Sequence, residues 1–453
     1  MNKIIDSNNI FVEQFNQLKG RLPGATLPWL ASLRSSAIEQ FSDCGVPTRR
    51  VEEWKYCNLS SVIDPEMVLA GPTVNGINNS LLEAYFIDPM PCHRMVFVNG
   101  YFRPDLSEMG VLPAGLSISS VEASLVSHGT LLEEHWMQGH NLTEDRLSGE
   151  SDPRPHAMVA LNTAFASGGA VVHIDRNVSA DGPIHLIYVS VSESGQTAIS
   201  HPRSLVVAES GAQATIFETF IGKNDGVHWS NALTQVSVGP GARICHYKHQ
   251  DESASSVHVG TSHVRLAQDS TYNSFVFSNG ARASRNEVRV WLEEENVNCI
   301  LDGVYLASGQ QRMDNWTKVD HMAPGGTTHE VYKGVIGDSA HGSFQGKIRV
   351  WPNAIHSDAR QLNKNLLLSQ ASEAASKPEL EILNDDVQCA HGSTIGDLDE
   401  EALFYLKARG MDDATARGLL INAFVGETID NLADVPIRKY FKNSFDAWLS
   451  KVI

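Results

Sequence analysis

The residues best suited to chemistry are Cys389 and His391, which lie two positions apart in the segment DDVQCAHGSTIG at 385–396. On an extended strand, side chains two positions apart point to the same face. A thiolate beside an imidazole could hold iron or zinc, or handle sulfur. The same spacing also suits a half-buried cysteine and a hydrogen-bonded histidine that merely end a sheet. The two residues alone leave both interpretations open.

The elements that must position this pair are strands, because strand-like runs follow one another from about residue 156 to 391. Turn signals such as DG, GPGA and NGA separate them. Gly211-Ala212 and Gly241-Ala242 begin similar segments thirty residues apart, which suggests a repeat. A sandwich or a barrel is compatible with the pattern, but a stack of coils accommodates this many strands more readily. We therefore predict a mainly β chain built on a parallel β-helix.

Helical regions are expected on both sides of this core. We expect an N-terminal helical region at 1–90, a β-helix core at 91–392 with a helical and loop excursion near 121–155, and a C-terminal helical region at 393–453. Two helical patterns follow the core. Asp397 with Glu400 predicts a capping-box start for the first, and the second is expected to begin near Asp413. The turn from sheet to helix is expected at Gly392–Gly396.

The C-terminal helices are apolar on more than one side. In the second pattern, one flank follows the full helical template and a further flank is also apolar. Such helices bury one face in a partner or pack on their own sheet, and the pattern does not choose between these hypotheses. The apolar positions are Leu403, Phe404 and Leu406 in the first pattern, and Ala416, Leu419, Leu420, Ala423 and Phe424 with Ile421, Val425 and Ile429 in the second.

Composition excludes several classes of protein. The 453 residues are 42% hydrophobic, carry a formal charge of −18 and contain no long apolar stretch, which predicts neither a membrane span nor a nucleic-acid surface. Six scattered cysteines without a C-x-x-C motif and an N-terminus without an apolar leader favour a reducing cytoplasm. The segment PTRRVEEWKYCNL at 47–59 combines basic and aromatic residues, but its glutamates predict an ion-paired, packed segment.

Several motifs do not carry a reaction. GSFQGKI at 342–348 lacks a Ser or Thr after Lys347, so it is not a Walker A loop and the chain alone is not expected to hydrolyse ATP. His246 and His249 are an odd number of positions apart and are expected on opposite faces of a strand, which argues against a metal pair.

Taken together, several stretches resemble the SufB/SufD scaffold proteins of the Suf iron–sulfur assembly system. They keep their order over nearly the whole chain: RRVEEWKYCNL, FVNGYF, ALNTAFASGGAVVHI, GVYLASGQQRMDNWTKVDH, YKGVIGDSAHGSFQGKI, QLNKNLLLS, KPELEI, DDVQCAHGSTIG and LDEEALFYLKARG. The resemblance implies a right-handed parallel β-helix between N-terminal and C-terminal helical regions.

Within that family the segment DDVQCAHGSTIG is similar to the SufD version. SufB-like chains carry a His-Glu pair at this turn, whereas Gly392 stands at the Glu position here. They also have an earlier reactive cysteine, and no cysteine lies between Cys299 and Cys389 in this chain. The resemblance therefore implies a SufD-type subunit that is not the primary sulfur acceptor.

The resemblance also implies partners and cargo. A SufB-type chain would pair through the ends of the β-helices, and a SufC-type ABC ATPase would dock on the C-terminal helices. No cofactor would be bound permanently, and a transient Fe–S cluster would be shared with the partner chain. His391 would be a ligand or proton-handling residue, Cys389 its neighbour, and isolated chains could form a homodimer. The implied docking residues are Leu403, Phe404, Leu406, Leu419, Leu420 and Phe424.

Two alternatives remain open at this stage. A carbohydrate-active β-helix enzyme would need paired carboxylates and usually a secretion signal. A purely structural solenoid would leave Cys389 and His391 inert. Under the scaffold hypothesis, deleting the residues after Gly396 is expected to remove the ATPase and leave a folded β-helix.

Overall fold

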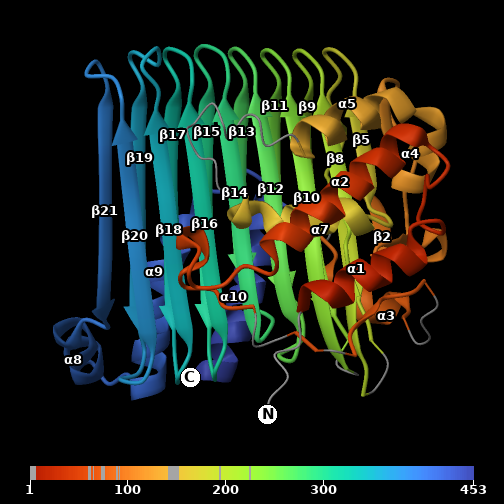
Figure 1. Cartoon of the computed structure of the whole chain (residues 1–453). Helices are drawn as coiled ribbons and strands as arrows, with labels where there is room; N and C mark the ends of the chain where they lie inside the picture. Colours follow the sequence, from red (N-terminus) through yellow and green to blue (C-terminus); the bar gives the residue numbers. More distant parts are fainter. Residues whose placement is uncertain are drawn as a thin grey trace.

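A parallel β-solenoid of about seven turns forms the body of the molecule, with helices on either side of it (Figure 1). The computed structural model describes residues 7–59, 63–64, 66–72, 77–87, 90, 92–140, 153–192, 195–223 and 226–453. The predicted fold class, a mainly β chain with flanking N-terminal and C-terminal helices, is confirmed.

The solenoid consists of two sheets, and from β8 onward consecutive strands along the chain alternate between them. Sheet A contains β1 (Val68–Leu69), β4 (Leu116–Ser120), β5 (Ala170–Ile174), β7 (Thr197–Ser200), β8 (Arg203–Ala208), β10 (Val227–Val238), β12 (Val257–Leu266), β14 (Ala283–Leu292), β16 (Arg312–His321), β18 (His341–Val350) and β20 (Glu373–Ile382). Sheet B contains β2 (His93–Val98), β3 (Tyr101–Phe102), β6 (Ile184–Ser190), β9 (Gln213–Gly222), β11 (Arg243–Asp251), β13 (Thr271–Ser278), β15 (Asn298–Ala307), β17 (Thr327–Ile336), β19 (Asp358–Leu367) and β21 (Gln388–Asp397).

The suspected repeat is the coil itself. Residues Gly211 and Gly241 both have positive φ values, 72° and 68°, which a residue without a side chain adopts at low cost. The Gly211 N–H donates to Pro240 O, and the Gly241 N–H donates to Gln268 O, so each turn is hydrogen-bonded to the next turn in the stack. The thirty-residue spacing is therefore one full circuit of the solenoid.

The main core lies between the two sheets. Because side chains alternate along each strand, one set points inward and meets the inward set of the facing sheet. On β2, β6 and β9 this inward set includes Phe97, Tyr188 and Phe220, whose rings stack at centroid distances of 5.1 and 4.8 Å. Stacking in register is the way a solenoid fills its interior, since each coil contacts only its neighbours.

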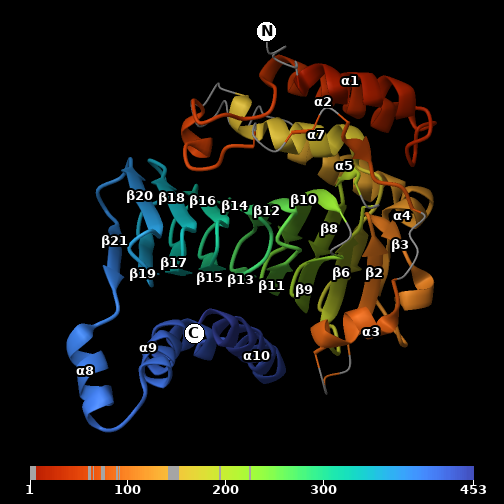
Figure 2. The same ribbon diagram turned by 90° about the horizontal axis from the view of Figure 1, so that it is seen from below.

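N-terminal helices cover the outer face of sheet A, as Figure 2 shows. Side chains of α1, α2 and α7 pack on Ile199, Trp229 and Val257 of this sheet. Every residue of α7 is buried, so its sequence has no polar face and no helical period, and it was absent from the sequence-based prediction. The helices on this face are α1 (Ser7–Leu18), α2 (Pro28–Cys44), α4 (Val121–Ser127), α5 (Gly129–His140) and α7 (Ala157–Phe165), whereas α3 (Asn79–Leu82) packs on sheet B, where Leu82 shares a cluster with Val96 and Ile187.

The excursion expected near 121–155 contains α4 and α5. Residues 141–152 of that excursion lie outside the described residues. Short 3-10 helices join other elements: η1 (Glu52–Trp54), η2 (Glu83–Tyr85), η3 (Pro104–Leu106) and η4 (Arg154–His156). In the described part of the chain, no helix has the length and apolar character needed to cross a bilayer.

Two C-terminal helices, α9 (Asp413–Asp430) and α10 (Val435–Val452), cover the outer face of sheet B (Figure 2). A third, α8 (Glu400–Ala408), precedes them and has no buried residue, so the expectation of two helical patterns was wrong. Strand β21 continues to Asp397, so Gly392 and Gly396 lie within it rather than in a turn. The N-cap of α8 is Asp399, whose side chain accepts hydrogen bonds from two backbone N–H groups, and not Asp397 as expected.

Candidate functional site

Cys389 and His391 lie on β21, the last strand of sheet B, at the end of the solenoid (Figure 1). In the parallel ladder with β19, Cys389 is opposite Ala359 and His391 is opposite Gln361. Both partners are buried in the solenoid interior. The two residues therefore share the inward face of β21, as the spacing predicts, and no later coil covers that face.

The two side chains differ in environment. Cys389 is partly buried and packs against the edge of the main core. This burial raises the pKa of the Cys389 thiol, which keeps it protonated at neutral pH until a metal ion or another electrophile displaces the proton. His391 is exposed, so its imidazole can be reached from solvent or from a second protein.

A row of polar residues leads inward from His391. Gln361, one coil deeper, donates a hydrogen bond of 2.6 Å from Nε2 to Oε2 of Glu330 on β17. Burial raises the pKa of Glu330 to about 7, although hydrogen bonds from Thr317 and Gln361 act in the opposite direction. The sequence analysis missed this row. The thirty-residue repeat is the signal that could have found it, because residues 330, 361 and 391 are about one coil apart.

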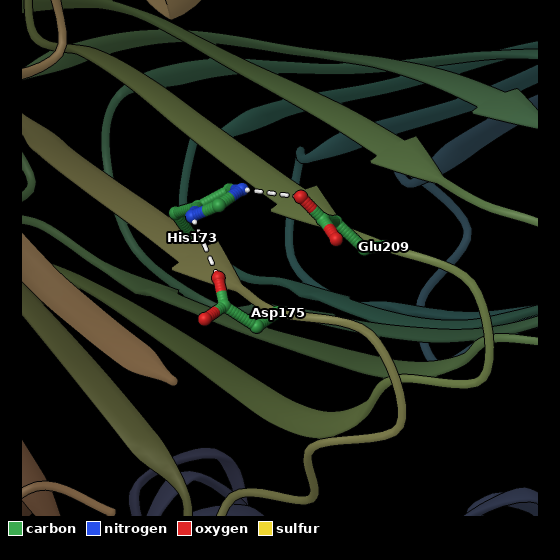
Figure 3. Close-up of side chains that lie close together, drawn as sticks. All are labelled: His173, Asp175 and Glu209. Carbon is green, nitrogen blue, oxygen red and sulfur yellow. Dashed lines mark ion pairs between the residues drawn. The ribbon is translucent and has the colours of Figure 1, made fainter. Parts of the chain in front are cut away.

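Cys389 and His391 do not form a complete metal site within the described residues. There, the one group of three His, Cys, Asp or Glu side chains with all donor atoms within 4.8 Å is His173, Asp175 and Glu209, far from β21 in the sequence. Figure 3 shows the His173 ring between the two carboxylates, with its nitrogens 3.4 Å from Asp175 and 3.2 Å from Glu209. Because each ring nitrogen already faces a carboxylate, this group is an ion-paired histidine on sheet A.

The other histidine pair behaves as predicted. On β11 the His246 side chain points into the solenoid, where Nδ1 and Nε2 lie 2.8 Å from the Tyr272 hydroxyl and 2.9 Å from Glu218. His249 points outward and its Nδ1 lies 2.6 Å from the Tyr440 hydroxyl of α10. Both are satisfied structural residues on opposite faces.

The apolar flanks of α9 divide between two roles. Ile421, Val425 and Ile429 are buried against sheet B, so this flank packs on the protein's own sheet. On the template flank, Ala416 is buried, Phe424 packs against the core beside sheet B and Leu420 is partly buried, whereas Leu419 (49%) and Ala423 are exposed. The sequence left open whether these helices face a partner or their own sheet, and of these positions the structure leaves only Leu419 and Ala423 exposed.

Helix α8 projects beyond the end of the solenoid and exposes large apolar side chains (Figure 2). Phe404 is 75% exposed and Tyr405 is 57% exposed, whereas Leu403 and Leu406 are partly buried. Leu403 also lines a cavity of about 430 Å³ between α8, α9 and the end of β19. We call the exposed residues Phe404, Tyr405 and Leu419 the α8–α9 surface.

Ion pairs and hydrogen bonds fix α9 and α10 on sheet B. Lys333 Nζ of β17 donates to Phe424 O at 2.8 Å and lies 2.6 Å from Glu427 Oε2. The Tyr247 hydroxyl of β11 donates to Asp434 at 2.8 Å, just before α10. Helix α9, which carries Leu419, is therefore fixed on sheet B, and the ion pair of 2.6 Å between Lys407 and Asp413 links α8 to the first residue of α9.

Comparison with known proteins identifies the family of this chain. Residues 5–186 match the SufBD protein N-terminal region, and residues 190–424 match the SufBD core domain of SUF-system FeS cluster assembly. An iron–sulfur cluster assembly SufBD family protein of Synechocystis is 30% identical over 411 residues, covering 89% of this chain and 87% of that protein.

Two further relatives carry the name SufD. The iron–sulfur cluster assembly protein SufD of Escherichia coli is 27% identical over 403 residues, 89% of each chain. SufD of Bacillus subtilis is 24% identical over 443 residues, covering 91% of this chain and 92% of that one. The chain therefore belongs to the SufB/SufD family and to the machinery that assembles iron–sulfur clusters.

Proposed function

We propose that this chain is the SufD-type, non-catalytic scaffold subunit of an iron–sulfur assembly complex. It pairs with a SufB-type chain through the open end of its solenoid and carries a SufC-type ABC ATPase on the α8–α9 surface. The observation that carries the proposal is the pair Cys389 and His391 on an uncovered inward face of the last coil. The names of its relatives support the same role.

The two terminal strands differ in their capacity to pair. In a parallel strand, alternate residues direct their N–H and C=O groups to opposite neighbours. The Glu373 N–H of β20 donates toward β18, to Ala340 O, so Pro378, five residues on, turns its nitrogen to the open edge. The edge of β20 therefore lacks one donor, as is common for edge strands.

On β21 the open edge keeps its donors. The Gln388 N–H donates to Ser357 O on the β19 side, so Cys389, His391 and Ser393 direct their backbone groups outward. A partner strand can add there by main-chain hydrogen bonds. A SufB-type chain that adds at β21 would also cover the inward face on which the two donor side chains lie.

The cluster is cargo shared across that junction. This chain offers one thiol and one imidazole, which is fewer than the four ligands usual for an iron–sulfur cluster, so the remaining ligands must come from the partner or from the cluster's donors. Mixed cysteine and histidine ligation is known chemistry for such clusters. Iron would displace the proton that burial keeps on the Cys389 thiol.

Docking of the ATPase rests on the α8–α9 surface. Exposed aromatic and large apolar side chains such as Phe404, Tyr405 and Leu419 are typical of a protein–protein contact. The cavity beside Leu403 offers a place for one side chain of the partner. ATP hydrolysis would belong to that partner.

Sequence differences assign the subunit type. Gly392 takes the position of the SufB-type glutamate, and no cysteine lies between Cys299 and Cys389, so the first sulfur acceptor would lie in the partner chain. The cytoplasm is the proposed location, and isolated chains could pair as a homodimer through the same open edge. The carbohydrate-active alternative has no support from the family comparisons.

The test uses backbone chemistry at the open edge. Ser393→Pro removes one outward N–H and leaves the ladder to β19 in place, whereas Ser393→Ala keeps the N–H and serves as the matched control. After co-expression with SufB-type and SufC-type chains, the proline variant should recover less SufB-type chain, iron and sulfide than the alanine variant. Circular dichroism checks that both fold. Wild-type stoichiometry and iron content in a folded Ser393→Pro complex would contradict the proposal, and a complex without iron or sulfide in the wild type would favour a purely structural solenoid.

A further inference from the structure

A cavity of about 460 Å³ lies on the outer side of sheet A, away from the β21 pair. Its floor is formed by the first residues of four neighbouring strands, β14, β16, β18 and β20. Residues of the segment 49–58, which the sequence analysis singled out for its basic and aromatic composition, form its other wall. We call this cavity the sheet-A pocket. Its volume lies in the range of sites that bind small organic molecules.

The wall of the pocket is fixed in place. Glu52 accepts a hydrogen bond of 2.6 Å from Lys377 Nζ of β20 on its side chain, and its backbone carbonyl accepts one of 3.2 Å from Gln345 of β18. Trp54 is fully buried, donates to Pro155 O at 3.0 Å, and stacks on the guanidinium of Arg285 at 4.0 Å. These contacts confirm that the segment is packed, but the ion pair of Glu52 is formed with Lys377 of β20 and not with a basic residue of the segment. They fix this wall of the pocket.

Positive charge dominates the lining. Arg49, Lys55 and Arg312 line the pocket, and none of them forms an ion pair with a carboxylate among the described residues. The lining also holds two carboxylates: Asp314 shares the Arg285 guanidinium with Glu287, and Glu373 lies 3.0 Å from His341. In a chain with a net charge of −18, three cations against two carboxylates in one cavity favour an anion.

The rest of the lining is apolar or neutral. Tyr56 offers an aromatic face, which packs well against a planar ring. Met313 also lines the pocket, but its side chain is 1% exposed and lies in the core between the two sheets, so it offers a ligand no thioether. Burial raises the pKa of the Cys57 thiol to about 12, so this cysteine stays protonated and acts as a neutral wall. The pocket is therefore equipped to bind a ligand and not to react with it through sulfur.

We infer that the sheet-A pocket binds a phosphorylated small molecule of about mononucleotide size. Its phosphate contacts Arg49, Lys55 and Arg312, and its ring packs on Tyr56. A phosphate suits this lining better than a single carboxylate, because it carries more charge and has three oxygens for several donors. The ligand would join the N-terminal segment to β20, one of the two strands at the open end of the solenoid.

The chain supplies matched controls for a test. Arg50 is the neighbour of Arg49 and is exposed but does not line the pocket. Arg282 is likewise exposed and outside the pocket, and its backbone carbonyl accepts a hydrogen bond from the Arg312 N–H. Since all four arginines are exposed, replacing any of them with Gln should leave the fold intact.

Isothermal titration calorimetry on the full chain at fixed ionic strength measures the binding of AMP, adenosine and inorganic phosphate. AMP should bind saturably and more tightly than either of the other two. Arg49→Gln and Arg312→Gln should each weaken AMP binding about tenfold or more, since each removes a charge-assisted contact. Arg50→Gln and Arg282→Gln should leave it unchanged.

Three results would overturn the inference. One is the absence of saturable AMP binding at millimolar concentration. Another is adenosine or inorganic phosphate binding as tightly as AMP, because the site would then not need both parts of the ligand. The third is an equal loss of affinity in the pocket variants and their controls, which would indicate a general charge effect.

Discussion

Gln361 donates a hydrogen bond of 2.6 Å from its side-chain amide to the carboxyl group of Glu330, one coil deeper than His391. The open end of the solenoid is thus connected to a buried titratable group. Because burial raises the pKa of Glu330 to about 7, this carboxyl group makes stability depend on pH.

The direction of that dependence follows from proton binding. The unfolded chain loses the Glu330 proton near pH 4.5, whereas the folded chain keeps it up to about pH 7. Stability therefore falls as pH rises through this window, by a contribution on the order of 3 kcal/mol at most. Glu330→Gln should remove this part of the decline. The free energy of unfolding of the variant, taken relative to that of the wild type, should therefore be higher at pH 8 than at pH 5. Urea unfolding of both proteins at the two pH values measures the difference.

The effect of Glu330 must be separated from that of Asp302, a second buried carboxyl group with a raised pKa. Burial raises the pKa of Asp302 to about 7, so part of the decline will remain in the Glu330→Gln variant. Glu13→Gln, at an exposed position on α1, should leave the pH dependence as in wild type. A Glu330→Gln curve parallel to wild type from pH 5 to pH 8 would show that Glu330 is not protonated in the folded protein.

His391→Ala should leave complex assembly intact and lower the iron and sulfide recovered with the complex. The imidazole is exposed on the inward face of β21, where it can bind iron or move a proton near neutral pH, and alanine does neither. Cys389→Ala should have a smaller effect, because the main sulfur acceptor is expected in the partner chain. The measurements are iron and sulfide per intact complex and thermal stability, made on the same preparation. Together they distinguish a residue of the cluster site from a purely structural one. Unchanged iron and sulfide in a stable His391→Ala complex would remove this residue from the site.

Phe404→Ala should weaken recruitment of the ATPase at little cost in stability. The side chain is 75% exposed, so its removal leaves no cavity and should change the free energy of unfolding by about 0.5 kcal/mol or less. Phe441→Ala is the contrasting variant, because Phe441 is fully buried between α10 and sheet B and its loss should cost about 3–5 kcal/mol. Co-purification with the SufC-type chain and urea unfolding should separate the two effects. Full recruitment by Phe404→Ala would move the docking site elsewhere.

Truncation after Gly396 should prevent formation of a folded, monomeric solenoid. The expectation that the β-helix survives this deletion is not supported by the structure, because α9 and α10 bury Phe217, Phe275 and Phe277 on the outer face of sheet B. Exposing such an apolar face leads to aggregation or unfolding. Circular dichroism and size-exclusion chromatography of the truncated chain measure this, and a monodisperse, cooperatively melting product would contradict it.

Much of the solenoid could be predicted from the sequence because its strands and turns are local features. The turn at Asn99-Gly100 joins β2 to β3 as such a dipeptide predicts, with φ values of 54° and 90°. Within the strand-like region predicted at 156–391, the individual runs read from the sequence did not include the segments of β16, β19 and β20. Their inward positions are partly polar, as with Asn363, whose amide donates to Tyr332 O and is satisfied only between coils. The alternation of apolar and polar residues does not reveal a strand where its inward polar side chains are hydrogen-bonded to neighbouring coils.

The helices show the same limit. Helix α9 was predicted nearly to its first residue because it has a polar side, although which apolar flank faces sheet B depends on tertiary packing. Helix α10 was missed although Ile437, Tyr440 and Phe441 follow a helical spacing after Pro436. The site pair was found from residue types and spacing, whereas Gln361 and Glu330 required knowledge of the coil register.

The two ends of the solenoid are not equivalent. At one end the short antiparallel strands β3 and β4 are outermost, with α4 packed on β4, and at the other end the parallel strands β20 and β21 are outermost. Short edge strands covered by a helix resist further pairing. A solenoid with one open end can pair with one other solenoid through that end and with no more. Two chains paired in this way would expose only their covered ends at β3 and β4. The assembly would therefore stop at two chains, and the open edge could not start a fibre.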